Sequence, residues 1–139
     1  MTTAHQYEML ERIPTTEEHS FLWEAVGWGN VNTEMTAASL AHSVYGMVVV
    51  HDSKVIGMGR IVGDGHMYFY IQDVAVLPEF QGQGIGNTII EQLLSYIRSH
   101  SYPGAFVGLF ASHGNDPFYE RYGFKNHAPG MTGMFKVIE

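Results

Sequence analysis

The segment of residues 81–86, Gln-Gly-Gln-Gly-Ile-Gly, is the feature that most constrains this chain. It follows a strand-like run over residues 70–77 and precedes a run with helical periodicity. Glycines allow backbone N–H groups to approach a ligand closely, and the N-terminus of a helix adds unpaired donors and partial positive charge. A strand, this loop and a helix in succession therefore predict a binding site for a pyrophosphate.

The spacing of the glycines argues against two common nucleotide motifs. A Rossmann fingerprint needs G-x-G-x-x-G and an acidic residue about 20 positions further on. Gly82, Gly84 and Gly86 give G-x-G-x-G instead, and no acid lies near position 106. A P-loop needs a lysine followed by serine or threonine after its glycines, which this segment lacks.

The pattern Q-x-x-G-x-G, formed by Gln81, Gly84 and Gly86, resembles the acetyl-CoA loop of the GNAT superfamily of N-acetyltransferases. A second stretch, residues 117–124 (Pro-Phe-Tyr-Glu-Arg-Tyr-Gly-Phe), is similar to the F-Y-x-x-x-G-F element of the same family. The resemblance covers nearly the whole chain from about residue 5. It implies an α+β fold, with a mixed, mostly antiparallel central sheet of roughly six to seven strands flanked by about four helices.

Composition limits the class of protein and its partners. The 139 residues, 45% hydrophobic and 15% charged, suit one globular domain over residues 1–139. The net charge of −7 disfavours nucleic acid and anionic membranes as partners, since both attract clustered positive charge. The absence of cysteine excludes disulfides, thiolate metal sites and a cysteine nucleophile. The polar start, residues 1–6, is no signal peptide, so we expect a cytoplasmic location; a homodimer is left open.

Periodicity and turn residues predict the elements. Thr15 and Glu18 have the spacing of a capping box at the start of the first helix. The apolar repeat that begins at Ile85 predicts a helix reaching about His100. We expect strands over residues 6–13, 44–51, 55–62, 67–77, 106–111 (buried) and 131–137, and helices over residues 15–26, 35–43, 85–100 and 116–122.

The family resemblance implies acetyl-CoA as the co-substrate. The backbone of Val74 and Val76 would pair with the pantetheine arm, and the amides of residues 81–87 would hold the pyrophosphate. Asn115 is either the N-cap of a short helix or a contact to CoA. The predicted cofactor-binding residues are Val74, Ala75, Val76, Gln81, Gly82, Gln83, Gly84, Ile85, Gly86, Asn87 and Asn115.

Tyr119 and Asp73 are the predicted catalytic residues. The resemblance implies that Tyr119 protonates the departing CoA thiolate, and a phenol with a pKa of about 10 keeps its proton at neutral pH. The positions where family members often carry a base hold Tyr70 and Gln72, neither of which is an efficient base. We therefore expect a water relay that ends at Asp73 or His66. The alternative for Asp73 is a structural acceptor that meets donors or occupies a bulge.

The acceptor is predicted to be a primary amine. Trp28, Tyr70 and Gln72 are the predicted substrate-binding residues, and the acidic balance suits a cation. Residues 109–111, 118–119 and 130–135 resemble a branch of small bacterial enzymes and plastid serotonin or arylalkylamine acetyltransferases. A second function class, an acyl-CoA-binding sensor with little turnover, stays open. The eight histidines form no compact ligand set, so no metal is expected.

Overall fold

A computed structural model describes residues 6–139, which divide into two compact units, one that ends at residue 107 and one that covers residues 108–139. The expectation about a signal peptide falls largely on residues 1–5, which lie outside the described residues. Each unit is treated by itself below.

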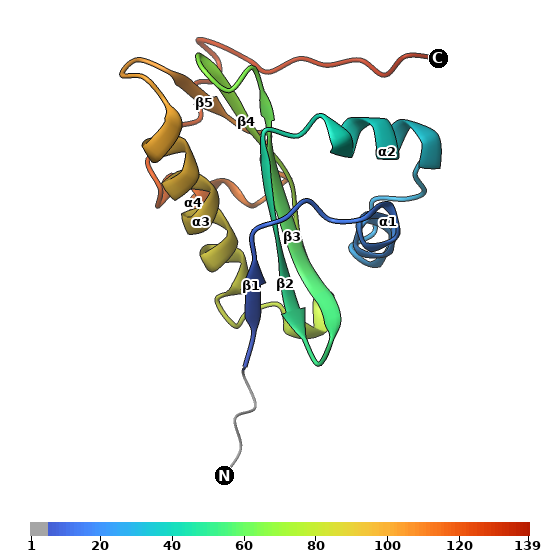
Figure 1. Cartoon of the computed structure of the whole chain (residues 1–139). Helices are drawn as coiled ribbons and strands as arrows, with labels where there is room; N and C mark the ends of the chain where they lie inside the picture. Colours follow the sequence, from blue (N-terminus) through green and yellow to red (C-terminus); the bar gives the residue numbers. More distant parts are fainter. Residues whose placement is uncertain (1–5) are drawn as a thin grey trace. The chain divides into compact units, whose positions relative to one another are not determined.

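The first unit is built on a sheet with helices on both faces (Figure 1). The strands follow the chain in the order β1-β2-β3-β4-β5, and the first three neighbouring pairs are antiparallel. Helix α3 packs against β2, β3 and β4, while α1 lies on the opposite face against β3 and β4 together with α2. The strands are β1 (Glu8–Leu10), β2 (Tyr45–His51), β3 (Lys54–Gly63), β4 (Tyr68–Val76) and β5 (Phe106–Gly108), the last of which ends in the second unit. The helices are α1 (Thr16–Ala25), α2 (Thr33–Ala41), η1 (Pro78–Phe80, a 3₁₀ turn) and α3 (Ile85–His100).

The capping box at the start of α1 is confirmed. The backbone N–H of Glu18 donates to Thr15 Oγ1 at 3.1 Å, and the backbone N–H of Thr15 donates to Glu18 Oε1 at 2.9 Å. The two bonds satisfy donors that the first turn of a helix would otherwise leave unpaired. Helix α2 starts earlier than expected, at Thr33, because the side chain of Asn32 accepts from the backbone N–H of Met35 at 3.0 Å.

Helix α3 ends at His100 as predicted, and its apolar stripe is buried against the sheet. The helix approaches β3 so closely that a Cβ on Gly59 would lie 2.6 Å from Ile89 Cγ2 and 3.2 Å from Leu93 Cδ1. Gly59 therefore allows the contact between helix and strand. This close packing holds the start of α3, and with it the glycine-rich loop, at one end of the sheet.

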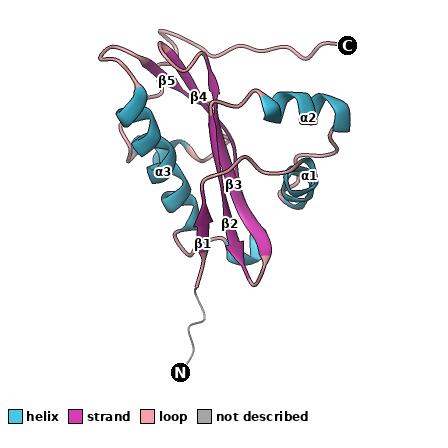
Figure 2. Cartoon of the chain, viewed as in Figure 1, coloured by secondary structure: helices cyan, strands magenta, loops and turns pink. Residues whose placement is uncertain are grey.

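Over the described residues the sheet has five strands, so the expectation of six to seven was wrong. Residues 131–137 form no strand and are drawn as loop in Figure 2; the side chains of Met134 and Phe135 are 87% and 82% exposed. The strand expected from Phe106 is present, but it stops at Gly108 and Phe106 is 47% exposed, so its expected extent to residue 111 and its burial were wrong. A strand needs a neighbour for its backbone hydrogen bonds, and apolar composition alone does not supply one.

The second unit, residues 108–139, contains α4 (Asp116–Glu120), which brings the α-helices of the described residues to four. Turns follow the helix: Tyr122 N–H donates to Tyr119 O at 2.9 Å and Gly123 N–H to Glu120 O at 3.1 Å. The helix is therefore a short local element whose turn fixes the position of Tyr119.

Candidate active site

The glycine-rich loop joins β4 to α3 through two left-handed residues. Gly82 has φ +80° and Gly84, the N-cap of α3, has φ +85°. A Cβ built on either residue would meet no atom within 4 Å, so these glycines are present for their backbone angles rather than for space within the protein. Thr88 N–H donates to Gly84 O at 3.1 Å, which closes the first turn of the helix. The amides before Thr88 precede the intrahelical hydrogen-bond pattern, as an anion site at a helix N-terminus requires.

The end of β4 presents its backbone toward the edge away from β3. Leu77 N–H donates to Ile56 O at 2.8 Å, which faces β3. Because N–H and C=O groups alternate in direction along a strand, those of Val76 face the other way. The side chain of Gln81 reaches this edge, since its Nε2 donates to Val76 O at 3.0 Å. The structure therefore brings together the strand end and the loop that were predicted to bind one cofactor.

A group of aromatic side chains connects the loop to the N-terminal part of the chain. Tyr7 OH donates to Gln83 Oε1. The Tyr7 ring lies 5.4 Å from that of His51 and 6.3 Å from that of Phe80, and the rings of His51 and Phe80 are 5.3 Å apart. Gln83 is thus held by a residue that precedes β1, a connection that spacing along the sequence does not indicate.

Asp73 occupies a bulge in β4. Arg60 is paired with Gln72 and Met58 with Ala75, so two residues of β4, Asp73 and Val74, stand where β3 has one. Asp73 has φ +58°, a backbone conformation that residues other than glycine adopt only at a cost in free energy. Both structural features anticipated for this residue, a bulge and a set of donors, are present.

The Asp73 carboxylate is held by two side chains from other elements. Its Oδ2 accepts from Arg60 Nε at 2.7 Å and from His19 Nε2 at 3.1 Å. Burial by itself would raise the pKa of Asp73, but the hydrogen bonds from His19 and Arg60 and the charge of Arg60 outweigh it and hold the pKa below its ordinary value. A carboxylate with a lowered pKa is a weak proton acceptor.

Arg60 completes the network by joining the sheet to α2. Its Nη1 donates to Ser39 O at 3.2 Å and to Ser43 Oγ at 3.0 Å, and its Nη2 donates to Ser39 Oγ at 3.0 Å. The residue is only 9% exposed, so its charge has to be paired within the protein. Arg60, Asp73 and His19 form a buried cluster, named here the β4 anchor, that connects β3, β4, α1 and α2.

Aromatic residues extend from the β4 anchor toward solvent. The rings of His19 and Trp23 are stacked with centroids 5.1 Å apart, and Trp28 lies edge-on to Trp23 at the same distance. Trp23 Nε1 also donates to Trp28 O at 3.0 Å, and Trp28 is 40% exposed. Trp28, predicted to bind substrate, therefore belongs to an aromatic wall that begins at His19.

The other predicted acceptor residues lie on β4. Tyr70 and Gln72 are half-buried, and the Tyr70 ring lies 5.7 Å from that of Phe106. His66 lies in the exposed turn before β4, where its backbone N–H donates to Asp64 Oδ1 at 2.8 Å. Its ring lies 6.4 Å from that of Tyr102, while the donors at Asp73 are Arg60 and His19. Among the described residues no hydrogen bond therefore joins His66 to Asp73.

Tyr119 belongs to the second unit and lies among aromatic rings. Its ring is edge-on to Phe118 at 5.0 Å and to Phe124 at 6.3 Å. Burial raises the pKa of Tyr119, so the phenol keeps its proton well above neutral pH. Asn115 occupies the N-cap position of α4, but its side chain makes no capping hydrogen bond. Its backbone O accepts from Phe118 N–H at 3.1 Å.

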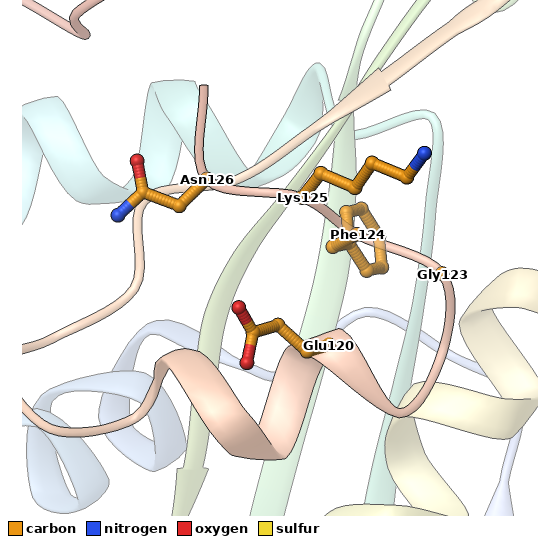
Figure 3. Close-up of a pocket in the computed structure, with 5 residues that line it drawn as sticks. All are labelled: Glu120, Gly123, Phe124, Lys125 and Asn126. Carbon is orange, nitrogen blue, oxygen red and sulfur yellow. The ribbon is translucent and has the colours of Figure 1, made fainter. Parts of the chain in front are cut away.

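A shallow pocket of about 450 Å³ follows α4 in the same unit. Figure 3 shows the Glu120 and Asn126 side chains extending to one side of it and the Lys125 side chain to the other. The lining residues are Glu120, Gly123, Phe124, Lys125 and Asn126. Asn126 Nδ2 also donates to Asp116 Oδ2 at 3.1 Å, so this side chain fastens the segment after the pocket to the start of α4.

Sequence reasoning missed His19 and Arg60. Arg60 could have been found, because a single charged residue in the apolar run of β3 must have a buried partner. His19 gave no comparable signal, since one histidine on a helix face has many possible neighbours. Among the described residues no group of acidic or histidine side chains is arranged to hold a metal ion, and no helix is long and apolar enough to cross a membrane.

A sheet covered by helices on both faces, with a glycine-rich loop between its fourth strand and the next helix, defines the class of acetyltransferase-type α+β domains. The chain belongs to the GNAT acetyltransferase family, whose model, described as Acetyltransferase (GNAT) domain, matches residues 42–126. The protein is therefore an enzyme of the N-acetyltransferase class.

Relatives and solved structures agree with this assignment. The chain is 30% identical over 118 residues to the uncharacterized N-acetyltransferase ycf52 of Porphyra purpurea, a match that covers 82% of this chain and 67% of the relative. A probable acetyltransferase of meticillin-resistant Staphylococcus aureus has a TM-score of 0.90 at 31% identity, covering 96% of this chain and 100% of that one. A GNAT family acetyltransferase of Brucella melitensis in complex with acetyl-CoA shares the fold, with a TM-score of 0.64 at 23% identity over 88% of this chain and 85% of that one.

Proposed function

We propose that the protein transfers the acetyl group of acetyl-CoA to a primary amine by direct attack. The observation that carries the proposal is the junction of β4 and α3: Gly84 begins the helix in a left-handed conformation, and Val76 presents its backbone at the adjoining strand edge. The amides of the loop suit the pyrophosphate, and the strand edge suits the amides of the pantetheine arm. The acetyl-CoA complex of the Brucella melitensis relative supports the same cofactor.

In the proposed reaction the amine nitrogen bonds to the thioester carbonyl carbon and the carbon–sulfur bond breaks. Tyr119 donates a proton to the departing thiolate, and the amine loses a proton as the amide forms. An acyl-enzyme on cysteine is excluded because the chain contains none. Asp73 stays a proposed end point for a water relay, although its two donors and lowered pKa weaken it as a base.

The proposed acceptor is a small amine, with arylalkylamines favoured. Support comes from the exposed Trp28 and from Tyr70 and Gln72 on β4, because aromatic faces attract ammonium groups. The net charge of −7 favours a cationic acceptor over nucleic acid or an anionic membrane. A cytoplasmic location and a homodimer remain part of the proposal, and light scattering of the purified chain would test the dimer.

A panel of amines assayed for CoA release tests the function. The panel should contain phenethylamine, tryptamine, putrescine, spermidine and a lysine peptide, each with acetyl-CoA. A thiol reagent reports CoA directly, because the protein has no cysteine of its own. Turnover with an amine supports the enzyme. Acetyl-CoA binding by calorimetry without turnover of any amine would instead support the alternative, an acyl-CoA sensor.

A further inference from the structure

The imidazole of His19 has one nitrogen with a partner and one without. His19 is 3% exposed, and its Nε2 lies 3.1 Å from Asp73 Oδ2. An ionised carboxylate can only accept, so Nε2 carries a hydrogen, and in the neutral imidazole Nδ1 then has a lone pair. Nδ1 is fully buried and has no hydrogen-bond partner among the described residues. A buried polar atom of this kind calls for a partner from outside the protein.

The charged groups beside His19 are connected to it through Nε2. Asp73 faces it from β4, and Arg60 of β3 donates to the same carboxylate oxygen at 2.7 Å. Arg60 is in turn held by Ser39 and Ser43, which carry no charge. Through its bond to Nε2, the Asp73 carboxylate fixes the tautomer and the orientation of the ring. A base oriented by a third group is a general feature of proton-transfer sites.

The surroundings of His19 also fit an ammonium group. Trp23 is stacked on the imidazole at 5.1 Å, and Trp28 continues the wall from Trp23 to the surface, where it is 40% exposed. The faces of tryptophan rings attract cations more strongly than those of other aromatic residues. These rings therefore form a continuous series from the buried imidazole of His19 to the exposed Trp28.

We propose that His19 accepts, at Nδ1 and through one water molecule, the proton of the acceptor's ammonium group, with Asp73 and Arg60 as positioning residues. The inference rests on the proposed function. The proton leaves the ammonium nitrogen, passes through the water to Nδ1, and is later returned to solvent. Loss of this proton leaves a lone pair on the amine nitrogen, which forms the bond to the thioester carbonyl carbon. The nitrogen loses a second proton as the amide forms, and this proton balances the one that Tyr119 gives to the thiolate.

Two acceptors of similar shape separate this role from a structural one. The first is the alkylamine with the highest kcat/KM in the panel, and the second is its analogue with two fluorines on the carbon next to the aminomethyl group. Fluorine makes the ammonium form much more acidic, so slightly above neutral pH most of the analogue is already neutral and needs no base before it attacks. Comparing the effect of a variant on the two acceptors therefore isolates the step in which the ammonium group loses its proton.

His19→Ala should lower kcat/KM for the alkylamine by about 10²-fold or more and leave the fluorinated analogue within about threefold of the parent. Added imidazole should restore part of the loss. His42→Ala is the matched control, since His42 is exposed at the end of α2 and its Nδ1 contacts Ala38 O at 2.9 Å; it should change neither rate. Equal losses for both acceptors, or no loss for the alkylamine, would overturn the proposal.

Two further measurements keep the test independent of how His19→Ala folds. His19→Gln keeps a side-chain donor for Asp73 and should show the same selective loss. In the parent protein, ¹⁵N spectra of labelled histidine should show a protonated Nε2 and an unprotonated Nδ1 at neutral pH; the opposite tautomer would overturn the proposal. A parent that binds acetyl-CoA and turns over no amine would refute the proposed function itself, before His19 is considered.

Discussion

Arg60 Nε donates to Asp73 Oδ2 at 2.7 Å, and this bond ties β3 to the residue at which β4 bulges. Asp73 has φ +58°, so its conformation is stabilised from outside the strand rather than by the strand itself. The bulge includes Val74, the first residue of the segment Val74–Val76 that is proposed to pair with the pantetheine arm. Arg60 and Asp73 thus help to set the geometry of the proposed cofactor edge of β4.

The first prediction concerns the pH dependence of stability. The lowered pKa of Asp73 means that the ionised form stabilises the fold at neutral pH. This contribution is present above the pKa of an unfolded aspartate, about 3.9, and is lost as pH falls through the lower folded value. Asparagine tolerates positive φ, so the substitution Asp73→Asn removes mainly the negative charge of the side chain. Denaturant unfolding should show a deficit for Asp73→Asn at pH 7 that narrows toward pH 2; a constant deficit would contradict the prediction.

A harsher substitution tests the β4 anchor as a whole. Asp73→Ala removes the carboxylate and leaves the buried Arg60 cation without its partner, which should lower the free energy of unfolding by about 3–5 kcal/mol. Chemical denaturation at pH 7 measures the loss. The double variant Arg60→Met with Asp73→Ala should recover part of it, because no uncompensated charge remains buried.

The second prediction tests the cofactor loop. Gly84→Asp adds a negative charge beside the proposed pyrophosphate and should abolish measurable acetyl-CoA binding. Gly84→Asn is the matched control, because asparagine tolerates a left-handed conformation and carries no charge. It should retain most of the affinity. Calorimetry that gives a folded Gly84→Asp protein the affinity of the parent would exclude this loop as the phosphate site.

The third prediction concerns Tyr119. Tyr119→Phe should reduce kcat by about 10²-fold while acetyl-CoA affinity stays nearly constant, as the loss of one general acid implies. Because burial raises the pKa of Tyr119, the parent should keep its activity further into alkaline pH than an ordinary tyrosine would allow. Steady-state kinetics and calorimetry on the same preparations measure both quantities. An unchanged kcat on a good acceptor would leave Tyr119 a positioning role at most.

The fourth prediction tests Asp73 as an end point of proton transfer. If a water relay ends at Asp73, Asp73→Asn should flatten the acidic limb of the kcat/KM profile and lower the rate near neutrality, because an amide accepts no proton. Should the enzyme select the neutral fraction of the amine instead, kcat/KM should rise toward the pKa of the acceptor in both proteins. A folded Asp73→Asn protein with the profile of the parent would remove this carboxylate from proton transfer.

The fifth prediction concerns the close contact that holds α3. Gly59→Ala would place a Cβ 2.6 Å from Ile89 Cγ2 and should cost about 1–3 kcal/mol of stability, as overpacking in a core does. Gly57→Ala on the same strand is the control. There the nearest atom, Ile89 Cδ1, lies 3.3 Å away at the end of a flexible side chain, so the cost should be smaller. Thermal unfolding of both variants compares them directly.

Local patterns in the sequence determined several parts of the structure. The capping box of Thr15 and Glu18, the extent of α3 to His100 and the glycine-rich loop before α3 were all predicted correctly. Each depends on interactions between residues within a few positions of one another, such as a cap, a helical stripe or a left-handed turn. Such interactions can be recognised from the sequence, and the resemblance to GNAT enzymes followed from two similarly short motifs, the glycine-rich loop and residues 117–124.

Tertiary structure alone decided which distant residues meet. His19 and Arg60 lie 54 and 13 positions from Asp73, and the three come together because α1 packs on the sheet and a bulge turns Asp73 toward them. The same limit explains the strand wrongly expected over residues 131–137, since an apolar alternating pattern cannot specify a neighbour to bond with. Long-range pairing is set by register and packing, and these exist only once the chain has folded.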